Sequence, residues 1–212
     1  MSRSSLALVT PPVSEPVTVG EVKSWLRIDD NSEDATLVAL VTTARMAAEE
    51  YLRRSLITQS WRMTLNPVRS RALDDLPAGV YDLPVNYFDG ALATSVVLPR
   101  GPIQSITTVT TYGLDDVGTV YDPVGYRLDA NSGRLLLTNG ATWPGSLRAY
   151  GAADVVYVAG YGPQAKDVPQ PIRTAILIHV AALYEQRGMC ESSMDLPPGA
   201  KQLLNQYRVV SL

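Results

Sequence analysis

The residues that could carry out chemistry are few and widely spaced. His179 is the only histidine and falls on the apolar stripe of an expected helix, and Cys190 is the only cysteine. Neither has a partner at the spacing of a metal site or a catalytic triad, so we interpret His179 as a core or interface residue and Cys190 as incidental. A lone cysteine also excludes an internal disulfide and a cysteine-based zinc cluster. No serine lies in a Gly-x-Ser-x-Gly elbow. We therefore expect no catalytic residue, no cofactor and no bound metal.

One segment resembles a phosphate-binding loop. Residues 160–165 match G-x-G-x-x-A after an expected strand, as in dinucleotide-binding proteins. That site needs a helix to begin at the second glycine, and Pro163, Pro169 and Pro171 postpone the helix. We therefore expect a strand that leaves its sheet through a glycine turn.

Acidic residues also fail to form a recognisable site. Asp29, Asn31 and Glu33 have the alternate spacing of a calcium loop, but Asp34 replaces the required glycine and Leu40 the final carboxylate. Helix capping explains this run better. The pairs at 74–75 and 115–116 lie in turn-like surroundings and are interpreted as solvated loop carboxylates.

The composition offers little attraction for nucleic acid or membranes. The 212 residues carry 18 basic and 21 acidic side chains, a net charge of -3, so any DNA contact must be local, for example at Arg69 and Arg71. Only three of the basic residues are lysines and the rest are arginines. This excess of arginine suits multi-donor contacts at interfaces or reflects a GC-rich genome. The N-terminal apolar patch at 6–9 is too short for a signal peptide, so we expect a soluble protein used without secretion.

The elements change type along the chain. Thr18 to Glu21 has the pattern of a capping box that opens a helix to about Ile28, with Val22, Trp25 and Leu26 on one face. Ser32 is expected to cap a second helix that ends near residues 53–54. From Ile57 the apolar period becomes two, which predicts strands. The predicted strands cover residues 57–65, 80–83, 94–98, 103–112, 126–129, 134–138 and 154–161.

Helix returns after residues 169–171 and is expected to end at Gly188. A polar stretch then leads to an apolar segment, which either binds a partner or docks on the chain's own helices. The expected fold is α+β: a bundle of N- and C-terminal helices, an inserted antiparallel β domain and an extended C-terminal tail. The expected boundaries are 1–55, 56–162, 163–190 and 191–212.

Several stretches, in this order, resemble the head-tail connector (adaptor) proteins of long-tailed phages and phage-like gene transfer agents. The resemblance spans roughly residues 18 to 190. It is carried by VGEVKSWLRID at 19–29, the helix from 33–34 to 49–52, LITQSW at 56–61, LPRGPIQSI at 98–106, YRLD at 126–129, VYVAGYG at 156–162 and VPQPIRTAI at 168–176.

The resemblance implies a structural protein that lies at the head-tail junction of a virion or phage-like particle. Before assembly the protein would be in the host cytoplasm. Such proteins form a ring, expected to be dodecameric, beneath the portal protein, with a stopper or tail-completion protein on the other face and DNA passing without specific binding. The C-terminal tail would then bind the portal. The residues expected to make this contact are Leu196, Leu203, Leu204, Tyr207, Arg208, Val209, Val210 and Leu212.

Two other classes are less well supported by the residues. A DNA-packaging factor or nucleic-acid-acting enzyme would need loop arginines and carboxylates to converge into one site, without an evident nucleophile or metal ligands. No sequence motif supports a small-ligand-binding module in the β domain.

Overall fold

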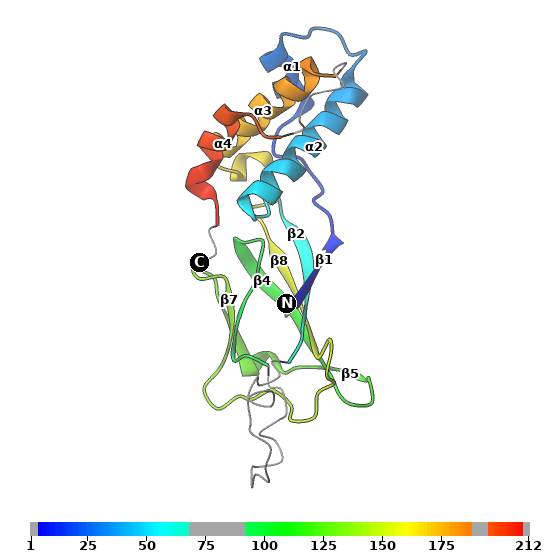
Figure 1. Cartoon of the computed structure of the whole chain (residues 1–212), viewed down its shortest axis with the longest axis vertical. Coiled ribbons are helices and arrows are strands. Elements are labelled where there is room, and N and C mark those ends of the chain that lie inside the picture. The colour runs from blue at the N-terminus through cyan, green and yellow to red at the C-terminus, as the bar shows by residue number, and fades with distance from the viewer. Residues whose placement is uncertain (1–3, 68–91, 188–194, 210–212) are drawn as a thin grey trace, which may run out of the picture. The chain divides into compact units, whose positions relative to one another are not determined.

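Helices and strands occupy different parts of the chain in the computed structural model, which describes residues 4–67, 92–187 and 195–209 (Figure 1). Two units can be distinguished. The helical unit comprises Thr10–Gln59, Pro99–Pro102 and Ala159–Leu212, and the β unit comprises Met1–Val9, Ser60–Leu98 and Ile103–Val158. The expected α+β class is confirmed. In this division the described residues 4–9 belong to the β unit, whereas 99–102 and the described C-terminal residues 195–209 belong to the helical unit.

The helical unit contains α1 (Val19–Leu26), α2 (Asp34–Leu52), α3 (Gln170–Glu185) and α4 (Pro198–Leu204), with short 3-10 turns at Ala165–Asp167 and Asn205–Tyr207. Helix α3 packs against the other three helices. Their apolar faces share one core, in which the largest fully buried side chains are Leu37, Leu52, Leu56, Ile57, Ile172, Ile176 and Leu204. Residues from both ends of the chain therefore complete the same core.

The helix termini show which local signals were correct. The Thr18 hydroxyl accepts the Glu21 N–H at 3.2 Å and the Glu21 carboxylate accepts the Thr18 N–H at 2.8 Å, so the predicted capping box is confirmed. The predicted Ser32 cap is wrong. Helix α2 begins at Asp34 without a side-chain cap, because the Ser32 N–H and hydroxyl both donate to Asp30. That local turn uses the group that would otherwise cap the helix.

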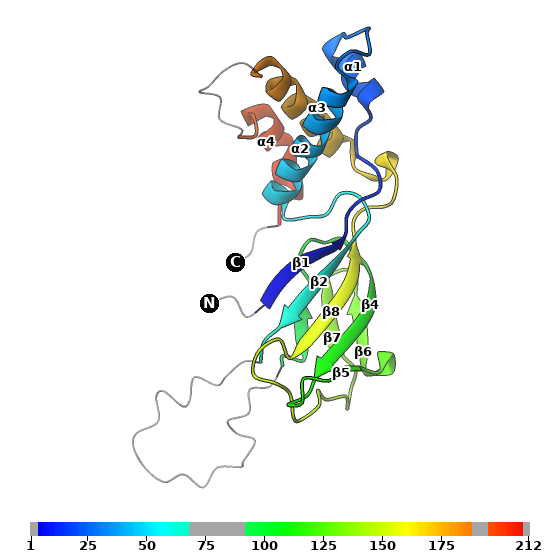
Figure 2. The ribbon, with the colours of Figure 1, turned by 90° about the vertical axis from the view of Figure 1, so that its right-hand side faces the viewer.

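The β unit holds a five-stranded and a three-stranded sheet (Figure 2). The larger sheet has the order β1-β2-β8-β4-β5, and the smaller one β3-β7-β6. The pairs β4–β5, β3–β7 and β6–β7 are antiparallel. The strands are β1 (Ser4–Thr10), β2 (Gln59–Leu65), β3 (Ser95–Val97), β4 (Ile103–Tyr112), β5 (Gly118–Val120), β6 (Tyr126–Asp129), β7 (Arg134–Leu137) and β8 (Ala153–Ala159).

Strand β8 lies in the middle of the larger sheet, and its side chains alternate between buried and half-buried. Val155 and Tyr157 are fully buried on one face of β8, as the period of two requires. Strands β1 and β5 form the two edges of the sheet and were not predicted. The strand predicted at 80–83 and the helix end at Gly188 lie outside the described residues.

Among the described helices, none is both long and apolar enough to cross a membrane.

Candidate assembly interface

Of the two alternatives left open for the apolar C-terminal segment, docking on the chain's own helices is what its described residues show. Leu204 is fully buried and Leu196 is 8% exposed, and both belong to the core of the helical unit together with Ala200. Leu203 and Tyr207 are partly buried against the same core. The three- and four-residue spacing of α4 and its neighbours places these apolar side chains on one face, which packs on α3 and α2.

Hydrogen bonds fix the end of this segment to α2 and the turn after it. Arg54 Nε donates to the Tyr207 carbonyl at 2.7 Å, and the Tyr51 hydroxyl donates to Asn205 at 2.6 Å. The Val209 N–H donates to the Leu52 carbonyl at 3.2 Å, and the Arg208 guanidinium lies 4.9 Å from the Tyr51 ring centre. The described part of the segment is thus attached to its own helices.

These contacts divide the residues expected to bind the portal. Leu196 and Leu204 contribute to the core, so neither offers a surface to a partner. Arg208 is exposed and Val209 is 40% exposed. Val210 and Leu212 lie outside the described residues, as do Arg69 and Arg71. Among the described members of the predicted set, Arg208 and Val209 are therefore the most accessible positions.

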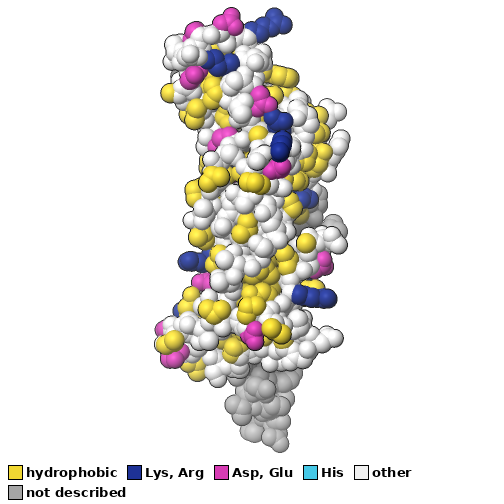
Figure 3. Space-filling view, turned by 180° about the vertical axis from the view of Figure 1, so that it is seen from behind, with side chains coloured by type: hydrophobic (Ala, Val, Ile, Leu, Met, Phe, Trp, Pro, Cys, Tyr) yellow, Lys and Arg dark blue, Asp and Glu magenta, His cyan; other side chains and the backbone are white. Residues whose placement is uncertain are grey.

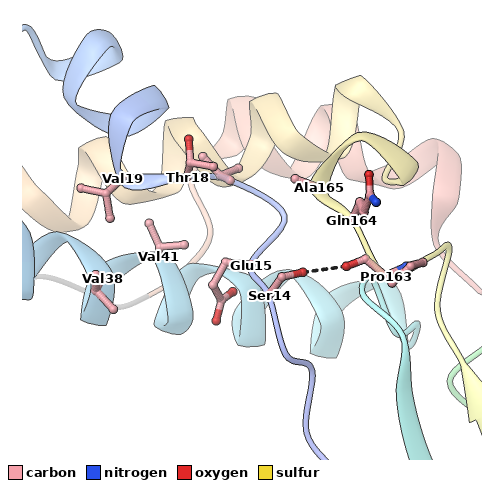
Figure 4. Close-up of a pocket in the computed structure, with 10 residues that line it drawn as sticks. Ser14, Glu15, Thr18, Val19, Val38, Val41, Pro163, Gln164 and Ala165 are labelled. Carbon is pink, nitrogen blue, oxygen red and sulfur yellow. Dashed lines mark hydrogen bonds between the residues drawn. The ribbon is translucent and has the colours of Figure 1, made fainter.

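An apolar pocket of about 400 Å³ lies in the helical unit between the approach to α1, α2 and the turn before α3 (Figure 4). Val19, Val38 and Val41 line one side and residues 163–165 another. The Ser14 hydroxyl donates to the Pro163 carbonyl at 2.8 Å and joins the two sides. Sequence reasoning missed this pocket because its walls come from segments about 150 residues apart.

Trp25 departs from its expected position. It is 49% exposed and lines a shallow hollow with Ser24 and Leu177, whereas Val22 on the same helix is fully buried. The stripe of α1 that faces the core is therefore narrower than the sequence pattern suggested.

A buried ion pair lies in the helical unit beside the pocket. Arg45 donates to Glu49 and to Glu15, each at 2.8 Å. Glu49 also accepts the Leu56 N–H and the Gln59 amide, each at 2.9 Å. Burial raises the pKa of Glu49, and these donors act in the opposite direction. Because every polar contact is made inside the chain, the cluster is structural, although its buried charges give it the appearance of a site.

The glycine segment that resembled a dinucleotide loop has a structural role. Gly160 has φ +136°, and a Cβ there would lie 2.6 Å from the backbone C and O of Ile57. The Tyr161 N–H donates to the Leu56 carbonyl and the Thr58 N–H to the Gly162 carbonyl, each at 3.0 Å. The glycines thus allow two backbone segments to pass in contact, and α3 begins only at Gln170, as the prolines predicted.

The acidic run near residue 30 also has structural partners. Glu33 accepts hydrogen bonds from the Tyr184 hydroxyl and from Arg187, and these donors lower its pKa. Lys23 donates to Asn31 and pairs with Asp34. The run therefore connects α2 to α3 and α1. In the described ranges, no group of three His, Cys, Asp or Glu residues is arranged to hold a metal ion.

His179 is buried in α3, and burial lowers its pKa. Its Nδ1 is buried without a hydrogen-bond partner. The apolar surroundings favour the neutral imidazole, as expected for a core histidine.

The surface charges do not form one patch on the face drawn in Figure 3, where lysine and arginine side chains are scattered among neutral and acidic ones. Asp116 pairs with Arg148, and Asp115 accepts the Val117 N–H. These carboxylates are exposed and occupied by loop contacts, as the sequence suggested.

Comparison with known proteins gives two kinds of match. Residues 16–90 match the family model described as phage gp6-like head-tail connector protein. This match supports the family resemblance seen in the sequence, over the first helices and the start of the β unit. A search of curated proteins found no match.

Solved structures agree with the chain over almost its full length. A chain in the neck of an empty GTA particle, computed with C6 symmetry, has a TM-score of 0.74 at 22% identity, with 98% of this chain and 97% of that one covered. A chain from the virion of a native gene transfer agent (GTA) particle has a TM-score of 0.73 at 23% identity, with 98% and 96% covered. A chain in the neck of a native GTA particle, computed with C12 symmetry, has a TM-score of 0.72 at 22% identity, with 98% and 97% covered. At these identities the likeness shows a shared fold.

Proposed function

We propose that this chain is a structural head-tail connector that lies at the junction between the head and tail of a phage-like particle. The observation that carries the proposal is the agreement of two independent matches. The connector family model covers residues 16–90, and the fold corresponds to particle-neck chains over 98% of the sequence. The likeness in fold alone would not give a function, so the proposal depends on the connector family model pointing to the same part of a particle.

We further propose that the chain acts as a ring, with twelve copies as the expected number. The neck structures to which it is similar were computed with C6 and C12 symmetry. A closed ring of more than two copies related by one rotation axis requires each copy to offer two different surfaces to its neighbours. The ring would surround the DNA exit channel beneath the portal, with a stopper or tail-completion protein on its other face.

The portal contact would use the exposed end of the C-terminal segment. The core residues of α4 hold this end in place, and Arg208 and Val209 face outward from it. A fixed exposed end loses less conformational entropy on binding than a free tail would. The segment then acts as a positioned contact and not as a long hinged arm.

Passage of DNA needs no specific nucleic-acid site. The chain has a net charge of -3, and Figure 3 shows no continuous basic patch on the face drawn. Weak phosphate attraction suits a channel through which DNA must slide, because each tight phosphate contact would add to the retention of DNA.

A reconstitution experiment tests the proposal. Portal-bearing capsids made without this chain would be mixed with the purified full chain, and bound copies would be measured by co-sedimentation and imaged in negative stain. We expect binding at one vertex, next to the portal. If the full chain does not bind such capsids, the connector proposal is refuted.

The C-terminal contact needs variants that keep the core. Truncation before Leu196 would remove Leu196, Ala200 and Leu204 from the core, so loss of binding could simply reflect unfolding. Arg208→Glu combined with Val209→Asp leaves the core side chains unchanged and alters the exposed end, including the contact of Arg208 with the Tyr51 ring. We expect at least about tenfold weaker capsid binding with unchanged circular dichroism. The matched control is Val124→Asp, which is 80% exposed in the β unit, and wild-type binding by the double variant would refute the C-terminal contact.

The alternative, a DNA-packaging factor or nucleic-acid-acting enzyme, makes a different prediction. Nuclease and ATPase assays with magnesium would detect it. Activity abolished by a carboxylate substitution would favour the enzyme, and the chains similar in fold, which come from particle necks and virions, favour the connector.

A further inference from the structure

The two edge strands of the five-stranded sheet carry neither charged residues nor proline, although β5, with three residues, is short. Strand β1 forms one edge and β5 the other. Edge strands present a row of backbone N–H and C=O groups to solvent, and monomeric proteins usually protect them with charged residues, proline or bulges. The sequences of β1 (SSLALVT) and β5 (GTV) contain neither a charged residue nor a proline. Within the described residues, no strand lies beyond either edge.

Apolar side chains are exposed at both edges. In β1, Leu6 is 36% exposed and Leu8 and Val9 are each 46% exposed. All three residues of β5 are exposed, with Val120 at 63%, and Val117 just before the strand is at 59%. Exposed apolar side chains along the edge strand of a sheet are features that recognise an added strand. Both edges therefore have the chemistry of a strand-pairing surface.

We propose that β1 of one copy pairs with β5 of the next copy, so that the sheets continue from subunit to subunit around the ring. This inference rests on the proposed ring function. A second copy is favoured as occupant because the same sheet carries both edges, and a ring needs two different surfaces on each subunit. Pairing of β1 with β1 would be self-complementary and would give dimers, which cannot close a ring.

The lengths of the strands set the strength of the contact. Strand β5 has three residues and β1 has seven, so only a short ladder can form. One such contact is weak, whereas many copies held on a common partner at high local concentration can form it together. We therefore expect the pairing on capsids and not between free chains in dilute solution.

Crosslinking on capsids tests the pairing directly. Cys190→Ser provides a cysteine-free background, since Cys190 is the only cysteine. Leu8→Cys and Val120→Cys would be introduced together, the chain bound to portal-bearing capsids, and a short bismaleimide crosslinker added. We expect a ladder of covalent oligomers on a denaturing gel. Leu8→Cys with Val97→Cys is the matched control, because Val97 is 51% exposed on a strand of the smaller sheet, and it should give no ladder.

The outcomes separate this inference from the proposed function. Chains that bind capsids but give no ladder, or give dimers from Leu8→Cys alone, would overturn the β1–β5 pairing and leave the connector role intact. Chains that do not bind capsids would overturn both.

Charge variants provide a second measurement that does not depend on crosslinker reach. Leu8→Lys combined with Val120→Lys places like charges on the two edges, and we expect about fivefold fewer copies per capsid. Leu8→Lys combined with Val120→Glu should restore the wild-type number, because opposite charges then meet across the contact. Equal loss in both double variants would overturn the pairing.

Discussion

The position of Leu204 provides a direct test of whether the C-terminal segment belongs to the core of its own chain. Leu204 is fully buried in α4, where its neighbours in the core include Ala200 and Leu196. Replacing a fully buried leucine by alanine typically lowers the free energy of unfolding by 2–5 kcal/mol, through the lost transfer of apolar surface and the cavity left behind. The Leu204→Ala variant should fall within this range.

The length of α4 places the expected loss toward the lower part of the range. The helix has only seven residues, too few to be stable in water without packing. It can therefore shift to fill part of the cavity, and if the contact is weakened further it can detach while α1, α2 and α3 stay folded. The total loss cannot exceed the free energy of docking α4, so we expect about 3 kcal/mol for Leu204→Ala.

Urea unfolding followed by circular dichroism at 222 nm is the appropriate assay, because the four α-helices of the described residues lie in the helical unit. The control is Val209→Ala, a truncation of a residue that is 40% exposed, which should change the free energy of unfolding by less than about 0.5 kcal/mol. A loss below about 1 kcal/mol for Leu204→Ala would refute the docked position of α4. The C-terminal segment would then be available to a partner along its whole length.

Three further perturbations test other parts of the helical unit. Gly160→Ala should lower the free energy of unfolding by about 3 kcal/mol or more, from a clash with the Ile57 backbone and a strained φ, whereas Gly20→Ala, with open space around it, should be neutral or stabilising. Arg27→Gly should raise the free energy of unfolding, measured by thermal unfolding, by about 0.5 kcal/mol. Arg27 ends α1 at φ 58°, and a glycine there avoids the left-handed backbone strain at some cost in conformational entropy. Burial lowers the pKa of His179 in the folded chain, so the unfolded chain binds more protons and stability should fall as the pH decreases through about 6.5. His179→Leu should reduce the change in the urea midpoint between about pH 7.5 and 5.5. A change as large as that of the wild-type chain would contradict this assignment.

Local sequence signals predicted the elements that depend on neighbouring residues. The capping box at Thr18 and Glu21 was found as expected, since both partners lie within one helical turn. The strand at 126–129 was predicted with its observed ends, and that at 103–112 likewise. Ser32 does not cap α2 because its N–H and hydroxyl donate to the carboxylate of Asp30, two residues away. The turn at Asp30 and the helix cap at Ser32 compete for the same hydroxyl, and only the structure shows that the turn forms.

The missed elements depend on distant partners. In β1, Leu6 and Leu8 alternate with smaller residues, but the neighbouring strand β2 begins nearly 50 residues later. Strand β5 has only three residues and is defined by its register with Thr110–Tyr112 of β4. The charged pair Arg45 and Glu49 is buried because Glu15, Leu56 and Gln59 come to it from other segments. None of these partners could be identified from the periodicity of the segment itself.

Burial also decides which apolar residues can contribute to assembly. The C-terminal leucines were expected to bind a partner, but Leu204 is fully buried, whereas Leu8 is 46% and Val120 63% exposed on the sheet edges. A side chain already removed from water gains little hydrophobic free energy from a partner, while an exposed one can gain it in full. In the proposed ring, the free energy of association would therefore come mainly from exposed positions such as the sheet edges, and α4 would hold Arg208 and Val209 in a fixed place.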